Sequence, residues 1–453
     1  MLRETVAQAV SHYHNLLEKT YLSDTVQSLE HAISERRLTV AGRPVCSVLR
    51  PHFIDSTSYE MVMRASTLVM RGFAELKQRL FQDSALRARL ELTPAEEEIV
   101  LIDTGYGAAD VSARLDGFLD AAGNFRFVEY NADSPGGIAF GDVLSEVFAA
   151  LPVVREFGRR FPFRILPVRS RTWDALLSTY HRWGGRGLPS IAIVDWRTTA
   201  TRNEFILMQE HFEARGCRVC VADPDELEYR NGKLYASGNP VDLVYKRLVV
   251  FELLERLGLR HPLVQAVKDH AVCMANGFAV QMLFKKSLFA MLNDPAIFAP
   301  RDPEVAEAVH THVPWSRLVR ECRTQYEGRT VDLVDFIMAN RNRLVLKPSS
   351  EYGGRGVQLG WESSEDEWKD TLATALQSSY IVQERVNLGV EIYPSFVDGK
   401  LTYDERYFDL DPYVWHGERI DGCGVRLSRG ALLNVSAGGG SATPLFVSSP
   451  FDF

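Results

Sequence analysis

Two short runs of the sequence carry side chains that could act on a bound anion and a cation. Arg114 and Asp116 stand two residues apart in an alternating run, and a second run repeats that spacing with Glu129 and Asn131. Residues two apart on a strand face the same side, so antiparallel pairing around a turn at 122–124 would bring two carboxylates and an amide oxygen together. Such oxygen donors suit Mg²⁺. Solvated charges at a strand edge are the alternative from spacing alone.

The stretch 344–360, LVLKPSSEYGGRGVQLG, has the pattern of strand, glycine-bearing loop and strand. Glycines let backbone N–H groups turn toward an anion, and Lys347 at the end of the first strand would supply a point charge for phosphate. The stretch lacks GxxxxGK[ST], and no helix pattern opens after it, which excludes a Walker loop and a Rossmann turn. A β-hairpin with a surface lysine is the alternative.

Helices and strands must position these two stretches. Amphipathic patterns predict helices over about 2–36 and 58–92, and Thr93 before Pro94 predicts a capped helix start. We expect no chemistry from residues 1–100, in which Arg50 and His52 are interpreted as solvated or core residues.

Further along the chain, a helix is predicted over 138–150, and alternating strands and helices over 188–280 favour a small parallel sheet. The stretch 261–275 is predicted to be helical. The stretch 281–292, which holds Lys285 and Lys286, is predicted to form one helix, where solvated lysines are the usual case.

Composition narrows the class of protein. The 453 residues suffice for about three domains, with 46% hydrophobic and 24% charged residues. A net charge of −8 disfavours a general nucleic-acid binder, and no apolar signal core or run of membrane-spanning length occurs, so a cytoplasmic protein is expected. Six scattered cysteines are too few for a disulfide framework. Cys217 and Cys220 form a CxxC without a second pair, which favours core cysteines over a zinc site.

The order in which several of these motifs occur along the chain matches that of a known family. The pair Arg114-x-Asp116, then EYNAD at 129–133, LVLKPSSEYGGRGV at 344–357 and YIVQERV at 380–386 resemble the circularly permuted ATP-grasp ligases, similar to the synthetase domain of glutathionylspermidine synthase. In ordinary ATP-grasp chains the metal motif follows the phosphate loop, whereas here it precedes it. The resemblance runs from about residue 100 to the C-terminus.

The resemblance implies an α/β (α+β) fold of the circularly permuted ATP-grasp type, with a small pre-ATP-grasp-like α/β domain and a helical N-terminal region. The expected divisions are a helical region at 1–100, the metal-binding part at 101–165, the α/β domain at 166–280 and the nucleotide-binding part at 281–453.

The resemblance also implies roles for single residues. It gives Mg²⁺ the ligands Asp116, Glu129 and Asn131, and it gives Arg114 the catalytic task of steadying charge on the transferring phosphoryl group. Contacts with ATP are implied at Lys286, Lys347, Gly353, Gly354, Arg355, Gly356, Gln383, Glu384, Arg385 and Val386. Contacts with nucleotide or substrate are implied at Arg426 and Asn434.

The function implied is an ATP-dependent carboxylate–amine ligase that joins two small molecules through an acylphosphate and releases ADP and phosphate. A phosphotransferase on the same cradle and a non-catalytic ATP-binding scaffold are the alternatives. The stretch between Lys286 and Lys347 is longer than in glutathionylspermidine synthase, the GGRG loop differs, and residues 1–100 show no amidase Cys/His pattern. Glutathione and spermidine are therefore not carried over.

The substrates are left open by the sequence. Arg50, Lys246, Arg247 and Arg426 hint at an acidic carboxylate substrate, with surface placement as the alternative for each. The sequence does not specify an oligomeric state.

Overall fold

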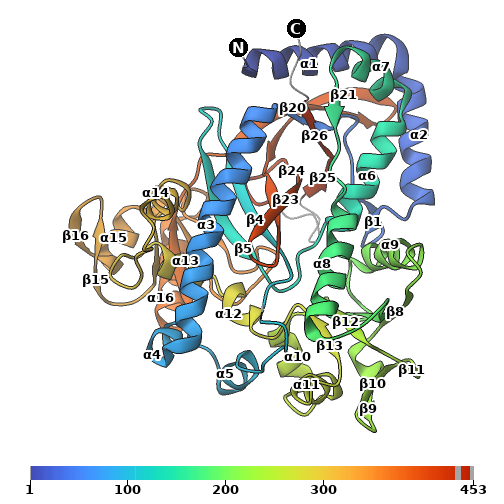
Figure 1. Cartoon of the computed structure of the whole chain (residues 1–453). Helices are drawn as coiled ribbons and strands as arrows, with labels where there is room; N and C mark the ends of the chain where they lie inside the picture. Colours follow the sequence, from blue (N-terminus) through green and yellow to red (C-terminus); the bar gives the residue numbers. More distant parts are fainter. Residues whose placement is uncertain (1, 108, 434–439, 449–453) are drawn as a thin grey trace.

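The computed structural model describes residues 2–107, 109–433 and 440–448 and has a mixed α/β architecture in which helices surround several sheets (Figure 1). The expected mixture of helices and strands is confirmed. Within the described ranges, no helix combines the length and the apolar character needed to cross a membrane.

The N-terminal region is mainly helical, as predicted. The helix expected over 2–36 is divided into α1 (Leu2–Leu16) and α2 (Leu22–Glu35) by a π-helical turn at Leu17–Tyr21. The long helix α3 (Ser56–Gln82) follows, and α5 (Pro94–Val100) begins as predicted. The Thr93 hydroxyl accepts from the Glu96 N–H, and the Glu96 carboxylate accepts from the Thr93 N–H, which satisfies two free donors of the helix end.

The first candidate run forms the predicted strand pair. Strands β4 (Ser112–Leu119) and β5 (Phe125–Asn131) are antiparallel, with Arg114 opposite Asn131 and Asp116 opposite Glu129. Their sheet has the order β23–β22–β4–β5, where β22 is Asp411–Trp415 and β23 is Arg419–Gly424. The predicted helix α6 (Ile138–Ala150) is confirmed with the expected bounds.

The second candidate run lies in another sheet, of order β14–β19–β17–β18. Strands β17 (Leu344–Pro348) and β18 (Gln358–Leu359) pair antiparallel around the glycine loop, which confirms the strand–loop–strand pattern. The remaining strands are β14 (Ser316–Leu318) and β19 (Tyr380–Glu384). Helix α16 (Glu365–Gln377), capped by Ser364, places Trp368 in a separate small core with Leu344, Leu346 and Val382.

A parallel sheet of order β13–β12–β7–β8 forms between these parts of the chain, as predicted. Its strands are β7 (Ser190–Val194), β8 (Arg218–Ala222), β12 (Leu243–Lys246) and β13 (Cys273–Ala275). The helix expected over 261–275 is wrong beyond α11 (Pro262–Lys268), because 273–275 is buried as an edge strand beside β12. Pairing in the sheet outweighs the local helical pattern there.

The C-terminal part closes the fold against the N-terminal region. Strands β20 (Gly389–Val397), β21 (Lys400–Phe408), β24 (Arg426–Ser428) and β25 (Gly440–Ala442) form one sheet. Strand β26 (Leu445–Ser448) pairs parallel with β3 (His52–Ile54) and antiparallel with β6 (Phe163–Arg164). Arg50 and His52 are buried here, and Arg50 pairs with Glu391 at 2.8 Å, so the interpretation of both as core residues is confirmed.

The other α-helices and β-strands of the described chain cover and connect these sheets. They are β1 (Thr39–Val40), β2 (Arg43–Pro44), α4 (Ser84–Arg87), α7 (Pro152–Arg160), α8 (Val168–Trp183), α9 (Arg202–Glu213), β9 (Leu227–Arg230), β10 (Lys233–Ala236), β11 (Asn239–Pro240), α10 (Val250–Arg256), α12 (Val280–Phe284), α13 (Ser287–Leu292), α14 (Pro303–His312), β15 (Arg323–Tyr326), β16 (Arg329–Asp332) and α15 (Leu333–Ala339).

Candidate functional site

A cavity of about 740 Å³ is lined by the end of the β4–β5 pair, by the loop between β17 and β18, and by loops of the parallel sheet. Of the residues singled out in the sequence, those that line it are Arg114, Asp116, Glu129, Asn131, Arg247, Lys286, Lys347, Gly353, Gly354, Arg355, Gln383, Glu384, Val386 and Arg426. Gly356 and Arg385 lie outside the lining, and Arg385 stacks over the Trp361 ring at 4.1 Å instead. Asn434 lies outside the described residues.

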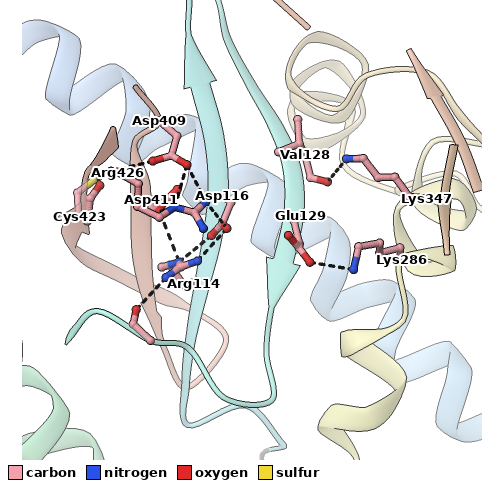
Figure 2. Close-up of polar contacts among 12 residues, drawn as sticks. Arg114, Asp116, Val128, Glu129, Lys286, Lys347, Asp409, Asp411, Cys423 and Arg426 are labelled. Carbon is pink, nitrogen blue, oxygen red and sulfur yellow. Dashed lines mark hydrogen bonds and ion pairs between the residues drawn. The ribbon is translucent and has the colours of Figure 1, made fainter. Parts of the chain in front are cut away.

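One wall of the cavity is a cluster of arginines and aspartates (Figure 2). Arg114 donates from Nε and Nη2 to both carboxylate oxygens of Asp116, at 2.7 and 2.8 Å. Arg426 donates from Nη2 to Asp116 at 2.7 Å and to Asp409 at 2.6 Å. Asp411 lies 2.9 Å from Nε of Arg426. Strand alternation therefore sets up the Arg114–Asp116 pair, and β22 and β24 complete the cluster from the far end of the chain.

The aspartates of this cluster differ in how they hold a proton. Burial opposes ionisation of Asp116, but Arg114 and Arg426 outweigh burial and lower its pKa to about 2. For Asp411, burial dominates and raises the pKa well above the usual range. Asp116 is thus the fixed anion that aligns the two guanidinium groups, and Asp411 holds its proton more tightly.

Two lysines lie on the other side of β5 (Figure 2). Lys286 pairs with Glu129 at 2.9 Å. Lys347 donates to the Gln383 side-chain oxygen at 2.6 Å and to the Val128 carbonyl at 3.3 Å. Burial lowers the pKa of Lys347 to about 8, Glu129 opposes this shift and Lys286 adds to it. Both lysines are therefore cavity residues rather than solvated surface charges.

The helix expected over 281–292 is wrong at its centre, where it breaks at Lys285 and Lys286 between α12 and α13. The break has a local cause, because the Lys286 N–H donates to the Ser349 carbonyl at 2.9 Å and the Ser287 N–H donates to the Ser349 hydroxyl at 3.2 Å. The backbone thus turns to dock on the end of β17, and this docking brings Lys286 beside Lys347.

Lys285, next in sequence to Lys286, also contacts the loop between β17 and β18. Its ammonium group donates to Ser350 at 2.8 Å and to Glu96 at 3.2 Å, and both members of the ion pair are buried. Glu96 belongs to the N-terminal region from which no chemistry was expected. Its capping role was predictable, but its partner is 189 residues away and left no signal in the sequence.

Asn276 is a second supporting residue that the sequence did not reveal. Its buried amide oxygen accepts from the N–H groups of Val111 and Ser112, both at 2.9 Å. Its amide nitrogen donates to the carbonyls of Ser112 and Ala132, at 2.7 and 2.8 Å. One side chain thus ties the start of β4 to the end of β5, which fixes how Arg114 and Asn131 face each other.

Asn276→Ala is expected to lower the free energy of unfolding by about 2–3 kcal/mol, because several buried backbone groups lose their partners. Urea unfolding measures the change. The exposed Asn239, whose side-chain amide donates to the Ser237 carbonyl at 3.3 Å, gives the control variant Asn239→Ala, for which a change within about 0.5 kcal/mol is expected. Equal losses in the two variants would contradict the role of Asn276.

The parallel sheet supplies another wall of the cavity. Asp195, Trp196 and Arg247 line it and directly follow the carboxyl ends of β7 and β12. Burial raises the pKa of Asp195 to about 6. Arg247 is buried and donates to the Pro135 carbonyl at 2.6 Å. Lys246 is buried outside the lining and pairs with Asp133, which does line the cavity. Open α/β sheets bind ligands at the carboxyl ends of their strands, so this wall of the cavity is a second candidate position for a ligand, apart from the lysine pair.

No protein-family model and no curated protein sequence matches this chain. Among solved structures, a glutathione synthetase-like effector (GSS30) from Globodera pallida in its apo form aligns over 99% of this chain and 98% of its own, with a TM-score of 0.57 and 12% sequence identity. The likeness is one of fold. This chain therefore shares its overall fold with that protein, and the chemistry of the site has to be argued from the residues of this chain.

Proposed function

We propose that this protein is an ATP-dependent carboxylate–amine ligase with a circularly permuted ATP-grasp fold. The observation that carries the proposal is the convergence of Lys286, Lys347 and Arg114 on one cavity, beneath a glycine-rich loop. A fold shared with a glutathione synthetase-like protein agrees with it.

The proposed reaction brings two anions together. A carboxylate oxygen forms a bond to the γ-phosphorus of ATP while the bond from that phosphorus to ADP breaks. An amine then forms the C–N bond, phosphate leaves, and the amine nitrogen loses a proton. Lys286, Lys347 and Arg114 would neutralise the charge that meets in the first step, and the loop at 349–357 would keep water from the acylphosphate.

The donors at the end of the β4–β5 pair fit a magnesium ion. Asp116, Glu129 and Asn131 would hold it with hard oxygen atoms. Within the described ranges, no three His, Cys, Asp or Glu side chains are grouped to bind a metal, so phosphate oxygens would complete the set. The Lys286–Glu129 pair at 2.9 Å would open as Lys286 turns to polyphosphate, which frees the carboxylate. The ion would neutralise and orient the phosphates.

Strand β19 offers the wall for adenine. Gln383, Glu384 and Val386 line the cavity, and Glu384 is fixed by the Tyr326 hydroxyl at 3.0 Å. The Lys347 contact with Gln383 joins this wall to the phosphate side. ATP and Mg²⁺ are thus the proposed cofactors, and a small carboxylate and a small amine are the proposed substrates.

The test is ATP consumption with Mg²⁺ across a panel of carboxylates crossed with amino acids and polyamines. Release of ADP and phosphate that requires both a carboxylate and an amine supports the ligase. AMP and pyrophosphate would contradict the acylphosphate route, and a stable phosphorylated product without an amine would favour the phosphotransferase. ATP binding without turnover by any pair would favour the scaffold.

Lys347→Ala is expected to weaken ATP binding about tenfold, because a charged phosphate contact is lost. Because the pKa of Lys347 is about 8, its ammonium form is present below pH 8 and is lost above it. The affinity of the wild type for ATP should therefore fall between pH 7 and pH 9. Titration calorimetry with ATP in the presence of EDTA measures this affinity without a contribution from a metal ion. Lys347→Arg should keep its affinity over that range, and the exposed Lys400→Ala should behave as wild type. A wild-type affinity that is flat with pH would contradict the assignment.

A further inference from the structure

Tyr352 connects the glycine-rich loop to the opposite side of the cavity. Its hydroxyl donates to Glu252 on α10 at 2.6 Å. The other carboxylate oxygen of Glu252 accepts from the Trp196 indole N–H at 2.7 Å, and Trp196 lies in the loop after β7. All three side chains line the cavity. One carboxylate therefore joins the loop at 349–357 to the edge of the parallel sheet.

The surroundings favour these two hydrogen bonds over other partners for Glu252. Each carboxylate oxygen of Glu252 accepts one of these hydrogen bonds, and among the described residues no ion pair competes for them. Burial raises the pKa of Tyr352 to about 12 and the hydrogen bond to Glu252 adds to the shift, so the phenol keeps its proton and donates. The ring centroids of Phe251 and Tyr352 are 6.3 Å apart, and the guanidinium carbon of Arg355 lies 5.4 Å from the centroid of the Tyr352 ring.

A second contact holds the same loop from the nucleotide side. The Lys286 ammonium donates to the carbonyl of Glu351, next to Tyr352. On the proposed function, Lys286 would give up this contact when it turns to a bound phosphate, and Tyr352 would still hold the loop, together with the Lys285–Ser350 hydrogen bond. Trp196 is in turn packed beneath Arg256, whose guanidinium lies 4.3 Å from its ring centre.

We infer that Tyr352, Glu252 and Trp196 form a positioning chain that holds the loop closed and couples it to the part of the cavity lined by the parallel sheet. None of the three is required to touch the reacting atoms. Coupling is reciprocal, so a ligand that moves Trp196 changes how long the loop stays closed, and loop closure changes affinity beside Trp196. The link to catalysis rests on the proposed function, whereas the mechanical link does not.

Hydrogen exchange of the full chain without ligands tests the mechanical link. Tyr352→Phe should raise exchange about fivefold in 350–357 and also in 195–199, and Trp196→Phe should raise it in 350–357, more than 150 residues away in sequence. Tyr229→Phe removes a similar hydroxyl–carboxylate bond, to Asp269 at 2.8 Å, away from the cavity, and should change neither segment. Unchanged exchange of 350–357 in Trp196→Phe would overturn the chain.

Product ratios test the consequence for the reaction. With a productive substrate pair, wild type should release one ADP for each amide formed, and Tyr352→Phe should release more, because an open loop lets water reach the acylphosphate. An unchanged ratio together with faster exchange would overturn the role in excluding water. If the protein turns over no ATP, the proposed function fails while the exchange experiment still decides the link between the two loops.

Discussion

Asn131→Ala is expected to reduce ATP-dependent turnover at least about a hundredfold and to leave the free energy of unfolding within about 0.5 kcal/mol of wild type. Asn131 is half-buried at the end of β5, where its side chain faces the cavity opposite Arg114 rather than the core. Removing its oxygen should therefore cost the proposed metal set a ligand without opening a core void. Steady-state ADP release and urea unfolding measure the two quantities.

Two further variants sharpen that result. Asn131→Asp keeps an oxygen ligand and should recover part of the turnover. Asn124→Ala removes an exposed asparagine from the turn of the same strand pair, where its side chain donates to Asp120 at 3.0 Å, and should stay fully active. Near-normal turnover in Asn131→Ala would count against a metal site at this edge, and a large loss of stability would show that the residue is structural.

Arg426→Ala is expected to lower the free energy of unfolding by about 3–5 kcal/mol, because Asp116, Asp409 and Asp411 would remain buried with one guanidinium group fewer. Arg429 is the matched control: it is exposed three residues later and pairs with Asp404 at 2.9 Å, and Arg429→Ala should cost less than about 1 kcal/mol. Denaturant unfolding of both variants at pH 7.5 measures the difference.

The pH dependence of the Arg426→Ala deficit has a definite sign. Burial raises the folded-state pKa values of Asp409 and Asp411, and both rise further without Arg426. The pKa of Asp116 loses part of the lowering that Arg114 and Arg426 give it. A carboxyl whose pKa is raised by folding destabilises the folded state once it ionises, and this cost shrinks as pH falls. The deficit should therefore be smaller at pH 5 than at pH 7.5. A deficit that stays constant, or that grows on acidification, would contradict the charge argument.

Features that depend on neighbouring residues could be predicted from the sequence. Alternation at two-residue spacing predicted the pairing of β4 with β5 and the shared face of Arg114 and Asp116. The start of α5 at Thr93 followed from local capping chemistry. The loop at 349–357 followed from its glycines. Each of these patterns lies within one short stretch of the chain, the longest being β4 to β5 over 112–131, and no distant contact overrides them in this structure.

Features that depend on distant contacts could not be predicted. The break at Lys285 follows from docking on Ser349, and strand β13 follows from pairing with β12. Asp409 joins the Arg114 cluster only because β22 pairs with β4 and because Arg426 on β24 contacts both Asp409 and Asp116. Tyr352 carried no role in the sequence, since its partner Glu252 lies 100 residues earlier. Each depends on which surfaces meet in three dimensions, and local patterning does not encode that.

The buried ion pair between Glu96 and Lys285 has a consequence for how this architecture can change during evolution. Either residue alone would leave a buried charge without its counter-ion directly beneath Ser350. Replacement of one without the other should thus be selected against, and homologous chains should keep both or exchange both for neutral residues. Positions 96 and 285 should therefore covary, and their covariation would mark the N-terminal helices as inherited together with the nucleotide cradle.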